Sequence, residues 1–262
     1  MKRLFLTLAL ASVMFTLGAQ SVLAQRNAMD PRAPAQTNVT YRAADGTTLE
    51  GYLAVPESGS GPFPAVLMIH EWWGLNQDIA ALADALAEEG FVVLAPDAFR
   101  GSVAQTPQNA RRQVTETPRE QIFADLDAAL DFLMDHPRVN ENRVGSIGFC
   151  FGGTHSMFLG TRNSDLAAVA TFYGGGPITD ASNLGELGRE APVLGVFGEE
   201  DGSIPVSEVE QFEAALERRN ADATITIYPG VGHAFVGSEN YDQGGTAEAA
   251  WNQMVRFFEE NL

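Results

Sequence analysis

The sequence has a single cysteine among its 262 residues, and its only lysine is Lys2. One cysteine cannot form an internal disulfide, so Cys150 is either a buried core residue or a thiol retained for its chemistry. No segment beyond residue 22 has an unbroken apolar run near the roughly 20 residues that cross a bilayer. These absences exclude a disulfide-rich scaffold and a multi-span membrane protein.

Positive charge is also scarce. The formal net charge is −18, and after Lys2 the side-chain cations are arginines and histidines. An acidic surface repels nucleic acid and anionic lipid, both of which need basic patches, so we expect neither as a partner. Two explanations of this composition remain open. One is adaptation to high salt, which screens repulsion between like charges, and the other is compositional drift.

The N-terminus has the pattern of an export signal. Lys2 and Arg3 precede an apolar stretch from Leu4 to Val22. The stretch is followed by Leu23 and Ala24, so that Val22 and Ala24 form a small-x-small end. This pattern predicts a signal peptide over residues 1–24, cleaved after Ala24, and a periplasmic or secreted protein with no membrane contact after cleavage. The alternative is a membrane anchor, but polar residues interrupt the run and Val22-x-Ala24 fits a cleavage site.

The remainder predicts a flexible lead-in over residues 25–37 and one domain over residues 38–262, long enough to bury a sizeable core. A β-hairpin is expected around the Asp45-Gly46 turn. Continuous apolar runs then alternate with amphipathic helical patterns, and a polar segment at 101–118 is expected to be a mobile cover. The order predicts an α/β fold: a doubly wound, mostly parallel sheet with helices on both faces and an N-terminal β-hairpin. The expected strands after the hairpin are 65–69, 91–95, 144–149, 167–173, 192–197 and 224–228.

The segment Gly148-Phe-Cys-Phe-Gly-Gly153 follows one of these strands directly. It has the form of the nucleophile elbow G-x-S-x-G, with Cys150 in the position of the serine. A sharp strand-to-helix turn holds the central residue in a crowded conformation, so its neighbours must lack a bulky side chain. The glycines therefore favour a reactive Cys150 over an inert core thiol.

Two more polar segments follow later strands, in the order nucleophile, acid, histidine that α/β-hydrolases have. They contain Asp201, which precedes Gly202, and His233 in Gly232-His-Ala-Phe235. In such a site the histidine takes the thiol proton and the carboxylate fixes the tautomer of the histidine. Glu199 and Glu200 remain alternatives for the acid. Among the other histidines, His70 is a candidate for the vicinity of the site, whereas His136 and His155 are expected to be structural.

Five segments in order resemble the dienelactone hydrolase (carboxymethylenebutenolidase) family. The resemblance extends from the first strands to the helix that contains Trp251, and it implies the α/β-hydrolase fold and a carboxylic ester hydrolase without a cofactor or metal. The segments are His70-Glu-Trp-Trp-Gly-Leu-Asn76, Ala95-Pro-Asp97, Gly148-Phe-Cys-Phe-Gly-Gly153, Gly198-Glu-Glu-Asp201 and Gly232-His-Ala-Phe235.

The resemblance also implies roles for individual residues. Glu71 matches a glutamate that contacts the resting thiol and helps it ionise when substrate binds. Independently of the family, a carboxylate beside a thiol disfavours the thiolate. The main-chain N–H groups of Phe151 and Trp72 match an oxyanion hole. A plain loop acid at position 71 and a packing role for the Trp72 side chain are the alternatives.

The sequence departs from the family in its arginines. Family members that act on dienelactone hold the substrate carboxylate with arginines; here Arg100 is displaced by one position from the first, and Gly237 replaces the second. A missing guanidinium removes a carboxylate clamp, which favours uncharged substrates. The substrate-binding candidates are Arg100, Trp73, Tyr173 and Phe235.

Together these patterns predict an exported, monomeric, cysteine-dependent hydrolase of small esters or lactones that acts through a Cys150-His233-Asp201 triad and an acyl-enzyme. The alternative from another class is a catalytically silent periplasmic small-molecule-binding protein on the same fold, since a fold does not fix a function. A metal-dependent hydrolase that uses His70 and Glu71 lacks the usual ligand spacing.

Overall fold

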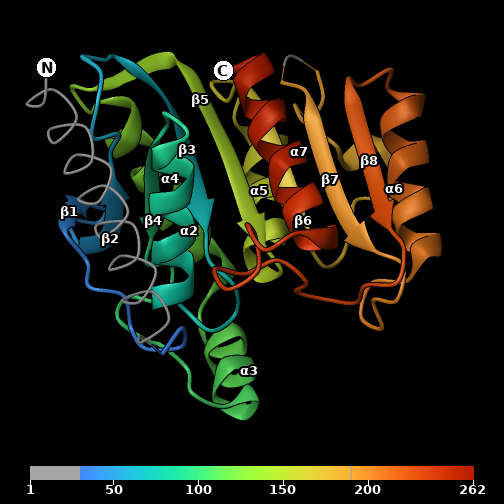
Figure 1. The fold of residues 1–262 in the computed structure, drawn as a ribbon, viewed down its shortest axis with the longest axis horizontal. Helices are drawn as coiled ribbons and strands as arrows, with labels where there is room; N and C mark the ends of the chain where they lie inside the picture. Colours follow the sequence, from blue (N-terminus) through green and yellow to red (C-terminus); the bar gives the residue numbers. More distant parts are fainter. Residues whose placement is uncertain (1–29, 190) are drawn as a thin grey trace, which may run out of the picture.

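The computed structural model describes residues 30–189 and 191–262 (Figure 1). The predicted signal peptide and its cleavage site lie outside these residues. Within them, no helix combines the length and the apolar character that a membrane span requires.

The centre of the protein is an eight-stranded sheet with the order β1-β2-β4-β3-β5-β6-β7-β8. The first two strands, β1 (Val39–Arg42) and β2 (Thr48–Ala54), form the expected antiparallel hairpin, and β2 pairs with β4 antiparallel. Every other neighbouring pair is parallel. The remaining strands are β3 (Phe63–Ile69), β4 (Val92–Pro96), β5 (Val139–Phe149), β6 (Ala168–Phe172), β7 (Val193–Gly198) and β8 (Ala223–Tyr228).

Helices cover both faces of the sheet. In the view of Figure 1, α2 (Gln77–Glu88) and α7 (Gly245–Asn261) lie in front of the sheet, and α4 (Arg119–Met134) and α5 (Phe151–Arg162) lie behind it. Helix α6 (Val206–Arg218) packs on β8 at the edge. Burial on both faces explains why β3, β4, β6 and β7 are nearly continuous apolar runs. The sheet confirms the predicted doubly wound α/β-hydrolase architecture.

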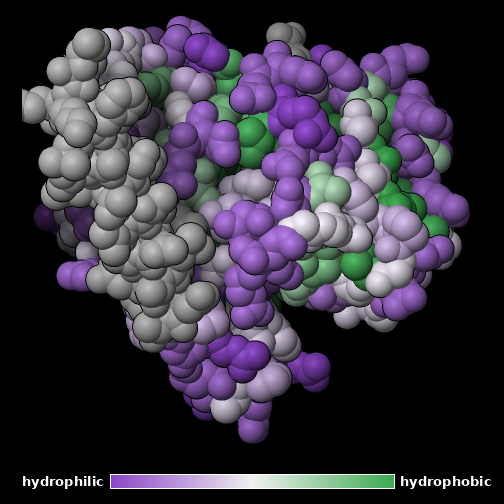
Figure 2. Space-filling view, viewed as in Figure 1, coloured by the Kyte–Doolittle hydropathy of each residue, from purple (hydrophilic) through white to green (hydrophobic). Residues whose placement is uncertain are grey.

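The segment 101–118 is more ordered than its composition suggested. It contains helix α3 (Pro107–Glu116), which projects from the body of the protein and carries a largely hydrophilic surface (Figures 1 and 2). Its start has a cap, since Thr106 Oγ1 accepts a hydrogen bond from the N–H of Asn109 and Pro107 occupies the first turn. The Thr-Pro pair is a typical helix start and was the available signal.

The structure also differs from the expected lead-in over residues 30–37. The N–H groups of Ala35, Gln77 and Asp78 bond to the oxygens of Leu75, Ala33 and Pro31, so this segment is attached to the loop after β3. The guanidinium of Arg32 lies 5.1 Å from the ring centroid of Trp73. Proline-rich composition suggested mobility because it carries no periodicity, but the main-chain groups found partners in a loop some 40 residues later.

Candidate active site

The strand β5 ends at Phe149 and α5 begins at Phe151, so Cys150 stands alone at the turn between them. Its backbone has φ 54° and ψ −113°, in the left-handed half of conformational space that a residue with a Cβ rarely adopts. An added Cβ would lie 2.0 Å from the Gly152 oxygen at Gly148, and 2.0 Å from the Ile69 oxygen at Gly152. The elbow therefore requires its glycines, and strain is concentrated at the cysteine.

The loop after β7 holds Asp201 in one orientation. Its Oδ1 accepts hydrogen bonds from the N–H groups of Ser203 at 2.8 Å and Ile204 at 3.1 Å. Its Oδ2 lies 2.6 Å from Nδ1 of His233, which follows β8. The Asp201 side chain is fully buried, whereas the His233 side chain is 29% exposed. The carboxylate thus fixes Nδ1–H on the histidine and leaves Nε2 free to accept a proton.

Cys150 and His233 line the same cavity of about 780 Å³, together with Glu71 and Trp72. No hydrogen bond in the described part of the chain joins the sulfur to the His233 ring. Contacts of this kind are often long or poorly aligned until substrate is bound. The rest of the lining is mainly apolar and comes from the loop after β3, α3, α4, α5 and the loops after β6, β7 and β8.

The surroundings of Cys150 favour the neutral thiol. Burial and, next, the carboxyl of Glu71 raise its pKa to about 12. The main-chain N–H groups of Phe151 and Trp72 act in the opposite direction, because they can donate hydrogen bonds to the sulfur. These two donors come from the start of α5 and from the loop after β3, so the sequence-predicted oxyanion-hole groups do meet at the sulfur.

Glu71 is a weak acid in this setting. Burial and, to a smaller extent, the charge of Asp78 raise its pKa to about 7. A carboxyl with this pKa is about half protonated in neutral solution. It therefore exchanges protons near neutral pH, while it opposes a second negative charge on Cys150.

The loop that carries Glu71 and Trp72 is fixed from two sides. His70 is fully buried. Its Nδ1–H donates to the main-chain oxygen of Glu71 at 2.6 Å, and its Nε2 accepts from the main-chain N–H of Ala98 at 3.1 Å. Burial lowers the pKa of His70, in keeping with a neutral ring that both donates and accepts. From α3, Gln113 Nε2 donates to the Trp72 oxygen at 2.5 Å. His70 thus lies beside the site as the sequence suggested, and Gln113 was not anticipated.

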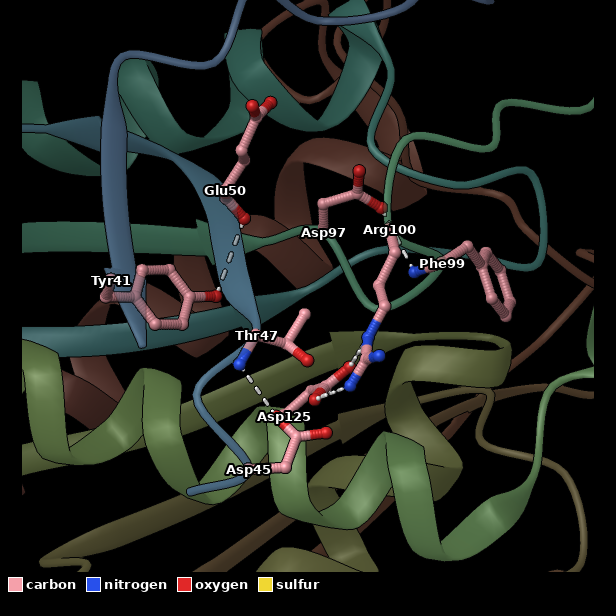
Figure 3. Close-up of polar contacts among 8 residues, drawn as sticks. All are labelled: Tyr41, Asp45, Thr47, Glu50, Asp97, Phe99, Arg100 and Asp125. Carbon is pink, nitrogen blue, oxygen red and sulfur yellow. Dashed lines mark hydrogen bonds and ion pairs between the residues drawn. The ribbon is translucent and has the colours of Figure 1, made fainter. Parts of the chain in front are cut away.

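Arg100 does not reach the cavity. Its Nε and Nη2 donate to the two oxygens of Asp125 on α4, each at 2.8 Å, in the network of Figure 3. Asp97 accepts from the N–H groups of Phe99 and Gly101 and holds the same loop. Burial, Asp125 and Asp97 raise the pKa of Tyr41, which faces this network. The prediction that Arg100 binds substrate is therefore wrong for this structure. Its guanidinium forms a bidentate pair with the buried carboxylate of Asp125 and has a structural role.

The other three substrate-binding candidates lie at different depths. Trp73 lines the cavity. Tyr173 is fully buried, and its hydroxyl donates to the main-chain oxygen of Val236 at 3.0 Å. The centroids of the Tyr173 and His233 rings are 5.2 Å apart, so Tyr173 supports the loop that carries His233. Phe235 packs on Tyr173 and Tyr228 and is absent from the cavity wall.

Several wall residues carry no sequence signal that singles them out. His155 was expected to pack within α5, and it does contact Phe151, with ring centroids 4.1 Å apart, but it also lines the cavity. Arg119 and Phe158 line it as well. In the described residues, no three His, Cys, Asp or Glu side chains are grouped in a way that could hold a metal ion.

A model of the dienelactone hydrolase family matches residues 49–262. The chain belongs to the dienelactone hydrolase family. It is 34% identical over 229 residues to protein usf of Aquifex pyrophilus, an alignment that covers 83% of this chain and 96% of that protein. It is 31% identical over 234 residues to a Synechocystis protein named "Putative carboxymethylenebutenolidase", with 82% and 92% covered.

Among solved structures, a dienelactone hydrolase-like promiscuous phosphotriesterase, P91, from metagenomic libraries superimposes with a TM-score of 0.73 at 26% identity. The match covers 87% of this chain and 99% of that one. This dienelactone hydrolase-like protein is therefore a hydrolase that acts on ester or lactone bonds.

Proposed function

We propose that this protein is an exported cysteine hydrolase that cleaves small esters or lactones through a thioester intermediate on Cys150. The observation that carries the proposal is the position of the single thiol. It stands on a strained turn at the start of α5, in the same cavity as a histidine whose Nδ1 is bonded to a buried carboxylate. Backbone strain retained at a single, partly buried nucleophile beside a cavity is typical of a reactive site.

In the proposed reaction, Nε2 of His233 takes the proton of Cys150, and the thiolate attacks the carbonyl carbon. The negative charge that forms on the carbonyl oxygen is stabilised by the N–H groups of Phe151 and Trp72. The carbon–oxygen bond of the ester then breaks, and His233 returns the proton to the leaving alkoxide. Water, deprotonated by the same nitrogen, attacks the thioester and releases the acid and the thiol. With a lactone, the alcohol and the acid are parts of one product.

In this cycle Glu71 protects the resting thiol by raising the pKa of Cys150. With the carboxyl beside it, the sulfur stays protonated until substrate changes the surroundings. An oxidising compartment favours such protection, because the thiolate and not the thiol is the oxidised species. The proposed periplasmic or secreted location rests on the sequence of residues 1–24 and is tested by the N-terminal sequence of the mature protein, which should begin at Gln25.

The nucleophile is tested with Cys150→Ala and p-nitrophenyl acetate. We expect turnover and the acylation burst to disappear while the midpoint of urea unfolding stays high. Full turnover in this variant would refute the cysteine mechanism. A silent binding protein would instead show no burst in the wild type and a slow, ordinary reaction with iodoacetamide.

A further inference from the structure

One face of α5 forms a wall of the cavity that leads away from Cys150. Phe151, His155 and Phe158 follow one another at intervals of four and three residues, which places them on one side of the helix, and all three line the cavity. At 1.5 Å of rise per residue, His155 lies about 7.5 Å along the helix axis from Cys150, and Phe158 about 12 Å. A flat group that extends from a carbonyl at the sulfur would lie along this wall.

His155 presents a hydrogen-bond acceptor on this otherwise aromatic wall. Its Nδ1 lies 2.8 Å from the Phe151 oxygen, and because a carbonyl only accepts, Nδ1 carries the hydrogen. Burial lowers the pKa of His155 to about 4, so the ring is neutral at physiological pH and Nε2 has a free lone pair. No described residue bonds to Nε2. In the described part of the chain, Thr171 Oγ1 is the only fully buried side-chain nitrogen or oxygen without a hydrogen-bond partner. Nε2 of His155 also lacks a partner but is not among the fully buried atoms, so it is accessible.

Arg119 supplies donors beside this acceptor. Its guanidinium carbon lies 4.3 Å from the ring centroid of Phe158 and 4.9 Å from that of Phe123. Stacking on a ring face leaves the N–H groups at the edge of the guanidinium free. Within the described chain no carboxylate forms an ion pair with Arg119, in contrast to Arg162, which also stacks on Phe123 but bonds to Asp127 at 2.6 Å.

We propose that this wall is a subsite for an uncharged aromatic ring that ends in a hydroxyl group. The hydroxyl donates to Nε2 of His155 and accepts from Arg119, while the ring lies along Phe151 and Phe158. A methyl ether cannot donate to Nε2, and a carboxylate brings its lone pairs against the lone pair of Nε2. The inference rests on the proposed function in that it defines which esters the same cavity accepts.

The test compares methyl 4-hydroxyphenylacetate with methyl phenylacetate and methyl 4-methoxyphenylacetate. The methylene group separates the carbonyl from the electronic effect of the ring substituent. We expect kcat/KM of the wild type to be about tenfold higher for the hydroxyl ester, the ratio that one hydrogen bond of about 1.4 kcal/mol gives. In His155→Phe, which keeps an aromatic ring, the ratio should fall to near one, and His155→Gln should recover part of it.

Arg162→Met is the matched control for Arg119→Met. Both variants lose a guanidinium stacked on Phe123, but only Arg119 lines the cavity. The hydroxyl preference should weaken in Arg119→Met and persist in Arg162→Met. A preference unchanged by His155→Phe, or a wild type that favours the methoxy or unsubstituted ester, would overturn the subsite.

A binding experiment separates the subsite from the catalytic mechanism. Calorimetry on Cys150→Ala, which needs no turnover, should show tighter binding of 4-hydroxyphenylacetamide than of phenylacetamide. The difference should vanish in the double variant with His155→Phe. Such a result supports the subsite even if Cys150 is not the nucleophile, and equal binding of the two amides contradicts it whatever the hydrolysis data show.

Discussion

The main-chain oxygen of Trp72 accepts a 2.5 Å hydrogen bond from Nε2 of Gln113, which ties helix α3 to the loop that contributes an N–H group at the sulfur. The other end of the Gln113 amide accepts from Ser102 Oγ at 2.8 Å. The position of the Trp72 peptide therefore depends on a helix about 40 residues further along the chain. A misplacement of about 1 Å in a catalytic group can cost on the order of 10²-fold in rate, so the position of this N–H group matters for its proposed role.

The Gln113 contact predicts a kinetic effect larger than the effect on stability. In Gln113→Leu we expect kcat for p-nitrophenyl acetate to fall about tenfold, which corresponds to about 1.4 kcal/mol in the barrier. Asn109→Ala changes an exposed position of the same helix and is the control. An unchanged kcat in Gln113→Leu would mean that α3 does not position Trp72.

Asp201 should matter because of its bond to His233 and not because of its charge alone. In Asp201→Asn, the amide can present an N–H group to Nδ1 and favour the wrong tautomer, so kcat should fall on the order of 10²- to 10⁴-fold. Glu200→Gln removes a neighbouring exposed carboxylate from the same loop and should leave kcat within about twofold. Comparable losses in the two variants would show that the loop needs negative charge in general.

Glu71→Gln should make the resting thiol more reactive. Without the carboxyl, the pKa of Cys150 falls, because Glu71 is the second cause of its rise after burial. We expect iodoacetamide to alkylate the variant several times faster than the wild type at pH 8. Hydrolysis should slow if Glu71 also assists ionisation when substrate binds. An equal alkylation rate would contradict the guarding role.

The same variant should change how stability depends on pH. The folded-state pKa of Glu71, about 7, exceeds the usual 4.5, so the folded protein binds more protons between these values and its stability falls as pH rises through them. The lost stability is roughly 1–3 kcal/mol, given 1.4 kcal/mol per pKa unit and some access to solvent at the cavity. Urea unfolding of Glu71→Gln should show a shallower decline from pH 4.5 to pH 7 than the wild type.

The elbow predicts a difference between two glycines. In Gly152→Ala, the new Cβ would lie 2.0 Å from the Ile69 oxygen, and relief requires β3 and α5 to separate. We expect a loss of about 3 kcal/mol in the free energy of unfolding. At Gly202 a Cβ meets nothing within 4 Å, so Gly202→Ala should be close to neutral. A similar urea midpoint for both variants would show that the turn tolerates a side chain at position 152.

Much of this fold and its elbow follows from local sequence. The apolar runs predict the strands because a buried parallel strand has no polar face, and the glycines around Cys150 predict the turn because nothing larger fits there. Helix α3 has no apolar periodicity that would predict it, because only Ala110 and Gln113 on it are buried.

The polar contacts depend on how the elements pack, which local sequence does not record. Arg100 near the Pro-Asp segment suggested substrate binding, but its partner Asp125 is a side chain 25 residues further on. Arg119 and His155 reach the cavity because α4 and α5 pack against each other. The sequence therefore indicates the elbow and the polar segments that follow the strands better than it predicts which side chains line the cavity.

The attachment of residues 30–37 to the loop after β3 has a consequence for any shortened form of the chain. A chain trimmed to the first strand would retain every strand of the sheet. It would lose the partners of the Gln77 and Asp78 amides and the guanidinium that covers Trp73. A well-behaved, soluble truncation could then have a misplaced wall next to Glu71, so good yield and a cooperative melt would be poor guides to an intact catalyst.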